Sequence, residues 1–403
     1  MFYDKQPMKN RENYKEMLSN MGKLSNLFSE NECPYLAYRA HENIFCKYLK
    51  AENLARLDCS ADAKKGKIGI GLKTWMGSDD QKVAEFGKLK KSYEGLTGMA
   101  LVRRIAEYRN ERIRVTKKLY GIDEMIYHIV KRIPGAMQIL ECSFDSIDIE
   151  KIKINEKKGN DNNTYFTDGK HEYHFSISKN TLFMIFKDME KLDEFEVEII
   201  DNPYNLIMSF MSVEKINIDE KDLFVDSKYV KNDISYSNDN KKKKQLCLPL
   251  YSRKGNKKFV AEKSGLNQWK AAGRVRDVNE IYIPYNAVDR NRDLDFFPPR
   301  DTPFVLHLPD GTEMSAKVCQ EADKNNPQIG KAIMSNPNKE LGKWLLRDVF
   351  ELKEGTVVTY EMLEKFGIDS VVFTKNSERD YSIDFSEIGT YEAFYSLQSG
   401  EEE

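Results

Sequence analysis

Apolar residues near the N-terminus recur at mixed spacings of three and four, which is the pattern of amphipathic helices. The segments YKEMLSNMGKLSNLF and HENIFCKYLKAENLA, which begin within residues 10–50, carry it. Two short apolar-rich runs follow, RLDCSADA and KIGIGLKTW, and the turn between them at 64–67 contains Gly66, so a strand pair is expected. Residues 79–110, rich in Lys, Glu and Leu, predict a long helix.

From residue 136 onward the pattern changes to strands. The runs AMQILECSF, KIKIN, TYFTD and EYHFSIS are short and apolar-rich, and Asp168-Gly169 is a turn signal between the last two. The N-terminal half is therefore expected to be α+β.

A polar, charge-blocked stretch lies between residues 214 and 263. It places NDNKKKK and RKGNKK on either side of the apolar island LCLPLY. After it come the strand-like runs EIYIP, PFVLHLP, SAKVC, KWLLRDVF, VVTYEML, SVVFTK and YSIDF. This is typical of an all-β barrel with one or two short helices. We therefore divide the chain into an N-terminal domain (1–213), a charged linker (214–263), a barrel (264–395) and an acidic tail (396–403).

Composition narrows the possible functions. A chain of 403 residues accommodates two domains, and 63 Lys and Arg nearly cancel 65 Asp and Glu. DNA contact must then come from local clusters of charge. No signal-peptide core and no apolar run of membrane-spanning length is present, which predicts a soluble cytoplasmic protein. The six cysteines have no C-x-x-C pair, which disfavours structural zinc.

Two polar clusters of the C-terminal third have side chains suited to reading bases. The first, SGLNQWKAAGRVRDVNEIYIP, contains Asn267, Gln268, Arg274, Arg276, Asp277 and Asn279. The second, GKAIMSNPNKELGKW, contains Lys331, Ser335, Asn336, Asn338, Lys339 and Lys343. Arg pairs with the guanine edge, Asn and Gln with the adenine edge, and Asp accepts from cytosine. The alternative is that the asparagines form turns and the arginines are solvated.

These strings, together with LPLYSRKG, FFPPRDTPFVLHLPDG, AIMSNPNKELGKWLLRDV and GIDSVVFTK, resemble a known DNA-recognition domain. It is shared by EcoRII-type and BfiI-type restriction enzymes and plant B3 transcription factors, and the resemblance is closest to the NgoFVII-like restriction endonuclease family. It covers about Leu248 to Phe394. It implies a seven-stranded pseudobarrel whose first arm, Gln268 to Glu280, and second arm, Lys331 to Lys343, enter the major groove of double-stranded DNA. It also implies a type II-like restriction endonuclease, which would act beside a cognate DNA methyltransferase.

The resemblance also suggests a phospholipase-D-like nuclease, which needs an H-x-K pair. His41, His128, His171, His174 and His307 are followed two positions later by Asn, Val, Tyr, Ser and Pro. No H-x-K exists, so this chemistry is rejected.

The stretch from His41 to Trp75 instead looks like a PD-(D/E)xK nuclease core. There a helix carboxylate, a strand aspartate and a strand lysine act with Mg²⁺ on a phosphodiester. The resemblance assigns Glu42 to the helix, Asp58 or Asp62 to the strand ligand of the metal, and Lys73 to the lysine.

This assignment departs from the pattern at one position. Gly71 stands two residues before Lys73, where Asp or Glu is expected. Either another element supplies the second carboxylate, or Asp58 and Asp62 are strand-end residues and Lys73 a solvated charge. Asp168-Gly169-Lys170 also fits acid-x-Lys, but the Asp-Gly pair favours a hairpin turn.

The basic segment LVRRIAEYRNERIRVTKK, at 101–118, either contacts DNA phosphates or is a solvated helix face neutralised by Glu107 and Glu111. Cutting both strands is simplest with two sites, so a homodimer is expected. Two other functions remain open: a non-catalytic DNA-binding protein, and a metal-independent enzyme such as a glycosylase acting on a flipped base.

Overall fold

The computed structural model describes residues 1–54, 59–160, 162–187, 189–213, 243–255 and 257–399. Its N-terminal part is built on a six-stranded sheet in the order β1-β2-β3-β5-β6-β11. The strands are β1 (Glu52–Asn53), β2 (Ala63–Lys65), β3 (Ile68–Met76), β5 (Glu124–Ile133), β6 (Ala136–Ser143) and β11 (Glu190–Glu196). The predicted turn at Gly66 is confirmed, because β2 and β3 pair antiparallel across it.

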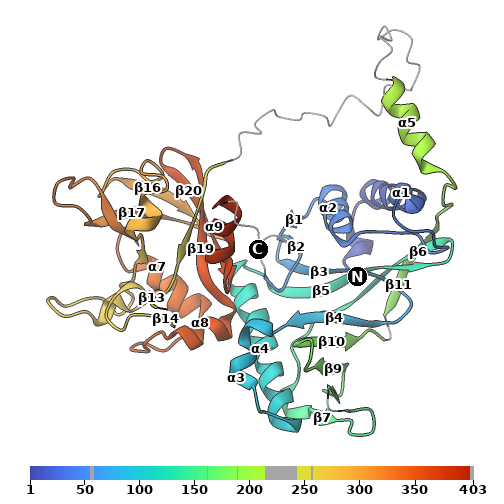
Figure 1. Cartoon of the computed structure of the whole chain (residues 1–403), viewed down its shortest axis with the longest axis horizontal. Coiled ribbons are helices and arrows are strands. Elements are labelled where there is room, and N and C mark those ends of the chain that lie inside the picture. Colours follow the sequence, from blue (N-terminus) through green and yellow to red (C-terminus); the bar gives the residue numbers. More distant parts are fainter. Residues whose placement is uncertain (55–58, 161, 188, 214–242, 256, 400–403) are drawn as a thin grey trace.

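Two layers of helices cover this sheet (Figure 1). The helices α1 (Met8–Lys23) and α2 (Tyr38–Leu49) pack on one face, where Tyr14, Phe45 and Ile126 share a core. The helix α4 (Gly98–Leu119) covers the other face, where Ile105, Tyr127 and Ile129 share a second core. Strand alternation explains the division, since successive side chains of β5 point to opposite faces.

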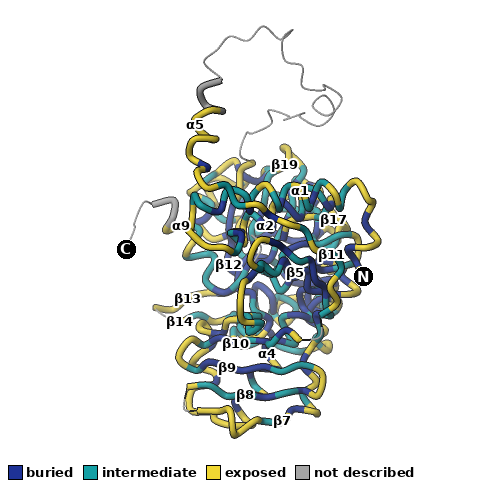
Figure 2. The backbone as a smooth tube through the Cα atoms, turned by 90° about the vertical axis from the view of Figure 1, so that its right-hand side faces the viewer, coloured by how far each residue is buried: buried dark blue, intermediate teal, exposed yellow. Residues whose placement is uncertain are grey.

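A second sheet of the N-terminal part has the order β4-β10-β9-β8-β7. Its strands are β4 (Asp80–Glu85), β7 (Lys153–Ile154), β8 (Asn163–Thr167), β9 (Glu172–Ser176) and β10 (Thr181–Ile185). Figure 2 shows β7, β8, β9 and β10 as a ladder at one end of the molecule. The turn predicted at Asp168-Gly169 is confirmed, because the Asp168 carboxylate accepts from the amides of Lys170 and His171.

The predicted long helix over 79–110 is wrong in its first part. Residues 80–85 form β4, which pairs with β10, and helix begins only at α3 (Lys90–Tyr93) and again at α4. The physical reason is that pairing with β10 satisfies the backbone of β4, whereas Gly95 and Gly98 take positive φ and separate the two helices.

The C-terminal part is a seven-stranded, nearly closed sheet in the order β12-β19-β20-β16-β17-β18-β15. The strands are β12 (Gln245–Pro249), β15 (Ile283–Pro284), β16 (Pro303–His307), β17 (Glu313–Glu321), β18 (Gly330–Ser335), β19 (Ile368–Ser377) and β20 (Asp380–Glu387). A separate hairpin pairs β13 (Ser252–Lys254) with β14 (Lys257–Phe259). The expected N-terminal α+β region and C-terminal barrel are thus confirmed.

The barrel begins earlier than the boundary set at residue 264. The apolar island LCLPLY, assigned to the linker, contains β12, which pairs along β19 with Leu246 and Leu248 fully buried. Flanking lysines hid this strand from a reading of composition alone.

Helical segments close the ends of the barrel. They are α6 (Ala287–Arg290), α7 (Glu340–Gly342), the π-helical segment η6 (Lys343–Val349), α8 (Tyr360–Phe366) and α9 (Thr390–Ser399). The run KWLLRDVF, expected to be a strand, is therefore helical. Its apolar residues Trp344, Leu345, Leu346 and Val349 are all buried. The remaining segments are the short helices η1 (Tyr3–Lys5), η2 (Ser25–Leu27), η3 (Gly87–Leu89), η4 (Ile149–Lys151) and η5 (Gly265–Lys270), and α5 (Pro203–Val213), which projects from the body.

The two parts share one continuous core along α4, which contacts α8 and η6 of the barrel. Arg114 donates to the carbonyls of Val349 and Phe350, and Lys118 pairs with Glu351 at 2.9 Å. No helix among the described residues is long and apolar enough to span a membrane.

Candidate functional site

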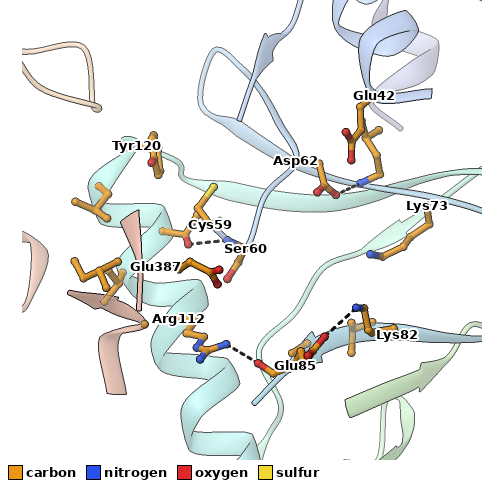
Figure 3. A pocket seen from close by; sticks show the side chains of 18 of the residues that line it. Glu42, Cys59, Ser60, Asp62, Lys73, Lys82, Glu85, Arg112, Tyr120 and Glu387 are labelled. Carbon is orange, nitrogen blue, oxygen red and sulfur yellow. Dashed lines mark hydrogen bonds and ion pairs between the residues drawn. The ribbon is translucent and has the colours of Figure 1, made fainter. Parts of the chain in front are cut away.

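A cavity of about 800 Å³ lies where the six-stranded sheet, α4 and the barrel meet. Its lining includes three of the residues singled out from the sequence, Glu42, Asp62 and Lys73. Figure 3 shows these three on one side of the cavity, and Arg112 and Glu387 on the other. We call this the candidate catalytic cavity.

Asp62 is fixed by the backbone around it. It precedes β2, its own amide donates to the Ile70 carbonyl at 2.9 Å, and its Oδ2 accepts from the Leu72 amide at 2.7 Å. The loop before it is tied to α4, because the Ser60 amide donates to Thr116 Oγ1 at 3.0 Å. Burial raises the pKa of the Asp62 carboxyl, and the charge of Lys73 partly offsets this rise.

Glu42 reaches the cavity from the first half of α2. Its side chain is buried, and Oε2 accepts from Arg39 Nη1 at 3.0 Å, one turn earlier on the same helix. Burial and the nearby Asp62 carboxylate raise the pKa of Glu42, while Arg39 and Lys73 lower it. Glu42, Asp62 and Lys73 are thus close enough to influence one another's charge.

Lys73 lies in the middle of β3. Within the described part of the chain, its ammonium has no ion pair or hydrogen bond to another side chain. An unpaired cation beside two carboxylates in a cavity is a feature of sites that handle charged substrates.

Gly71 explains where the expected second carboxylate cannot be. A Cβ at this position would lie 2.9 Å from the Tyr127 ring and 3.0 Å from that of Phe144, which stack with centroids 4.1 Å apart. The space that an acid would need is filled by aromatic packing. Asp58, the other predicted ligand, lies outside the described residues.

The donor set of the cavity suits Mg²⁺. This ion binds proteins through one or two carboxylates together with water, and Glu42 and Asp62 supply two. Among the described residues, no group of three or more His, Cys, Asp or Glu is placed to hold a metal. The two carboxylates therefore fit a site that is open to water and substrate, and they do not form a closed structural centre.

The expected neutralisation of this basic helix by Glu107 and Glu111 is confirmed, because Arg104 pairs with Glu107 at 3.5 Å and Arg114 with Glu111 at 2.8 Å. Three arginines of α4 also have partners elsewhere in the fold. Arg109 is buried and donates to the Asp145 carbonyl, while Arg112 donates to the Glu85 carbonyl and packs over the Phe86 ring. With Arg114 held by the barrel, these three side chains join elements of the fold.

A second hollow, of about 750 Å³, lies on the barrel between the predicted arms. It brings together six of the residues proposed to read bases: Gln268, Arg274, Arg276, Ser335, Asn336 and Asn338. Lys331 and Lys339 are exposed, and Lys343 lines a neighbouring hollow with Asn336. The sequence thus located one polar surface built from two segments about sixty residues apart.

Some predicted base contacts are turned into the fold. Ser335 is buried and its hydroxyl accepts from the Leu341 amide, while Asn279 Oδ1 accepts from Arg347 Nε at 2.7 Å. Asp277 caps the turn by accepting from the Asn279 amide. Ser335 and Asn279 are thus engaged within the fold, whereas Asp277 stays exposed.

Glu280 was missed as a site residue. It is buried at the base of the first arm and contacts both arms. A lone Glu before an apolar strand gives no signal in the sequence, because burial and partners depend on the folded barrel.

Comparison with known families matches residues 239–377 to the NgoFVII C-terminal B3-like DNA-binding domain. No curated protein matches the chain. The expected relationship is confirmed for the C-terminal part, which is similar to the B3-like DNA-binding domain of the NgoFVII-like family. The match begins before residue 264, in agreement with β12 being part of the barrel.

Proposed function

We propose that this protein is a type II-like restriction endonuclease that hydrolyses DNA phosphodiesters with Mg²⁺. The observation that carries the proposal is the convergence of Glu42, Asp62 and Lys73 in one cavity, in a chain whose C-terminal domain is a DNA-binding domain. The three residues come from α2, the loop before β2 and β3, so only the fold brings them together.

Glu42 and Asp62 would hold the metal. When bound there, Mg²⁺ would stabilise charge on the scissile phosphate and lower the pKa of a water molecule. The raised pKa values of the two carboxyls reflect the cost of burying negative charge, which a cation beside them would relieve.

Lys73 would act on the substrate and not on the metal. Its ammonium points into the cavity, where it would orient the attacking water and neutralise the phosphate. The Leu72 amide of β3 fixes one carboxylate oxygen of Asp62, and Leu72 directly precedes Lys73, so the aspartate and the lysine keep a constant relation.

The test is cleavage of unmethylated phage DNA by the purified full chain, in Mg²⁺ and in EDTA, with Lys73→Ala and the control Lys67→Ala. Lys67 lies outside the cavity and pairs with Asp123 on the surface. We expect discrete fragments that require Mg²⁺, unchanged cleavage by Lys67→Ala, and a loss of about a thousandfold or more with Lys73→Ala. Fragments that persist in EDTA or with Lys73→Ala would overturn the assigned chemistry.

A second candidate function is sequence-specific DNA binding without cleavage. Gly71 favours it, because the aromatic packing there excludes the carboxylate that completes related metal sites. DNA that stays intact in Mg²⁺ but shifts on a gel would support this function. The expected homodimer and partner methyltransferase belong to the nuclease proposal, and sedimentation of the chain with and without DNA tests the dimer.

A further inference from the structure

The two predicted recognition arms meet at one buried carboxylate. Glu280 is 1% exposed and ends the first arm, where its amide donates to the Asp277 carbonyl at 2.9 Å. A buried carboxylate costs free energy unless both oxygens are paired. The role of Glu280 therefore depends on the groups that pair with its two carboxylate oxygens.

Each oxygen of Glu280 is engaged by a different arm. Oε1 accepts from Arg274 Nη2 at 2.5 Å and lies 3.4 Å from Arg276 Nε, both in the first arm. Oε2 accepts from Asn338 Nδ2 at 2.9 Å, in the second arm. One side chain thus bridges segments 58 positions apart in the sequence.

The two arginines are placed differently around this carboxylate. Arg276 is mostly buried, and its Nη1 donates to the carbonyls of Ala271, Ala272 and Arg274, which closes the loop of the first arm. The side chain of Arg274 is about half exposed and borders the hollow between the arms. Glu280 therefore holds a loop that Arg276 has shaped, and leaves part of Arg274 facing the surface.

We propose that Glu280 is a positioning residue that fixes the spacing of the two arms before DNA binds, so that Arg274 and Asn338 reach one groove in a set relation. This inference rests on the proposed DNA recognition by the arms. Fixing both arms in advance reduces the ordering cost of binding. Pairing with guanidinium groups also prevents the carboxylate from repelling phosphates.

The proposal predicts that the two arms are energetically coupled. Removing Arg274 or Asn338 breaks the contact of Glu280 with one arm, so the fixed spacing of the arms is already lost. Removing the other residue as well then causes a smaller further loss. The combined loss in specific affinity should fall short of the product of the single losses by about fivefold or more, whereas independent base readers multiply. In a Glu280→Gln background this coupling should vanish.

The experiment uses the full chain and the duplex that the wild type selects from a pool of random sequences. Affinity for that duplex and for a scrambled one is measured for wild type, Arg274→Ala, Asn338→Ala and the double variant, each with and without Glu280→Gln. Asp289→Asn is the control, because Asp289 is equally buried in the barrel but bonds Tyr391. Thermal unfolding of every variant separates folding from recognition.

We expect Glu280→Gln to lose about tenfold or more in affinity for the selected duplex and little for the scrambled one, with Asp289→Asn binding both like wild type. Multiplicative losses in the cycle, or full specific affinity of Glu280→Gln, would overturn the positioning role. The cycle stands even where Glu280→Gln unfolds, since Arg274→Ala and Asn338→Ala leave Glu280 in place. A wild type without sequence preference would instead overturn the proposed recognition, and this inference with it.

Discussion

The recognition arms and the candidate catalytic cavity are both assembled from distant segments, but they differ in how their charges are satisfied. In the arms, Glu280 and the guanidinium groups of Arg274 and Arg276 pair with one another. In the cavity, Lys73 has no such partner among the described residues, and burial raises the pKa of Asp62. On the proposed function, the surface that would read bases is organised before DNA binds, whereas the cavity that would hold a charged substrate leaves Lys73 free to meet it.

The largest effect on stability should come from placing an acidic side chain at Gly71, where the nuclease pattern expects one. Gly71→Asp would drive a side chain into Tyr127 and Phe144, and we expect it to lower the free energy of unfolding by about 3 to 5 kcal/mol. Urea unfolding measures the loss. Gly87→Asp is the matched control, because the nearest atoms to its added Cβ are 4.0 Å away and its φ is not positive.

A Gly71→Asp protein as stable as the control would show that the aromatic pair yields. In that case the added carboxylate would be free to join Glu42 and Asp62, and Mg²⁺-dependent cleavage should increase. Packing against Tyr127 and Phe144 would then not explain why position 71 lacks an acid.

A half-buried carboxyl on β20 gives the next effect. Burial, with the Glu52 carboxylate second, raises the pKa of Asp384 on β20 to about 6. In the unfolded chain Asp384 releases its proton near pH 4, so the folded state holds more protons between these values. Stability from this group is present below about pH 4 and is lost as pH rises through about 6.

Asp384→Asn should remove that dependence. We expect it to be about 2 kcal/mol more stable than wild type at pH 7.5 and no more stable at pH 4, as measured by urea unfolding at each pH. Glu52→Gln should give a smaller gain with the same sign, since Glu52 is the lesser cause of the shift. Parallel stability curves for wild type and Asp384→Asn would contradict the assignment.

The sequence predicted the two regions unequally well, for physical reasons. Long polar strings marked the arms because turns and base-reading side chains are local features, and six of the predicted residues line one hollow. The carboxylates and lysine of the cavity were found only through a family resemblance. Glu280 and the early strand β12 were missed, since pairing with β19 and burial among the arms arise from tertiary contacts. The strand β4 was missed because its polar residues resemble a solvated helix.

The two arginines of the first arm, Arg274 and Arg276, distinguish base recognition from a structural role. Arg274→Ala should weaken binding to the selected duplex by about 1 to 3 kcal/mol and spare binding to random DNA. Arg276→Ala removes the donor to three carbonyls, so it should also lower the melting temperature of the protein. Gel-shift titration and thermal unfolding of both variants check this contrast. Equal loss on selected and random DNA for Arg274→Ala would remove it from the reading surface.

The smallest effect on stability should come from the exposed ion pairs that join α4 of the N-terminal part to the barrel. Glu351 pairs with Arg114 at 3.1 Å and with Lys118 at 2.9 Å, and all three side chains are partly exposed to solvent. Glu351→Gln should therefore cost less than about 1 kcal/mol, and 1 M salt should erase the difference. The control is Glu107→Gln. It breaks an exposed ion pair with Arg104, which lies on α4 like Arg114 and Lys118 but involves no residue of the barrel. Calorimetry distinguishes the outcomes: a single transition in both variants means that the shared apolar core couples the two parts. Two transitions in Glu351→Gln alone would mean that this ion pair is what ties the barrel to the cavity.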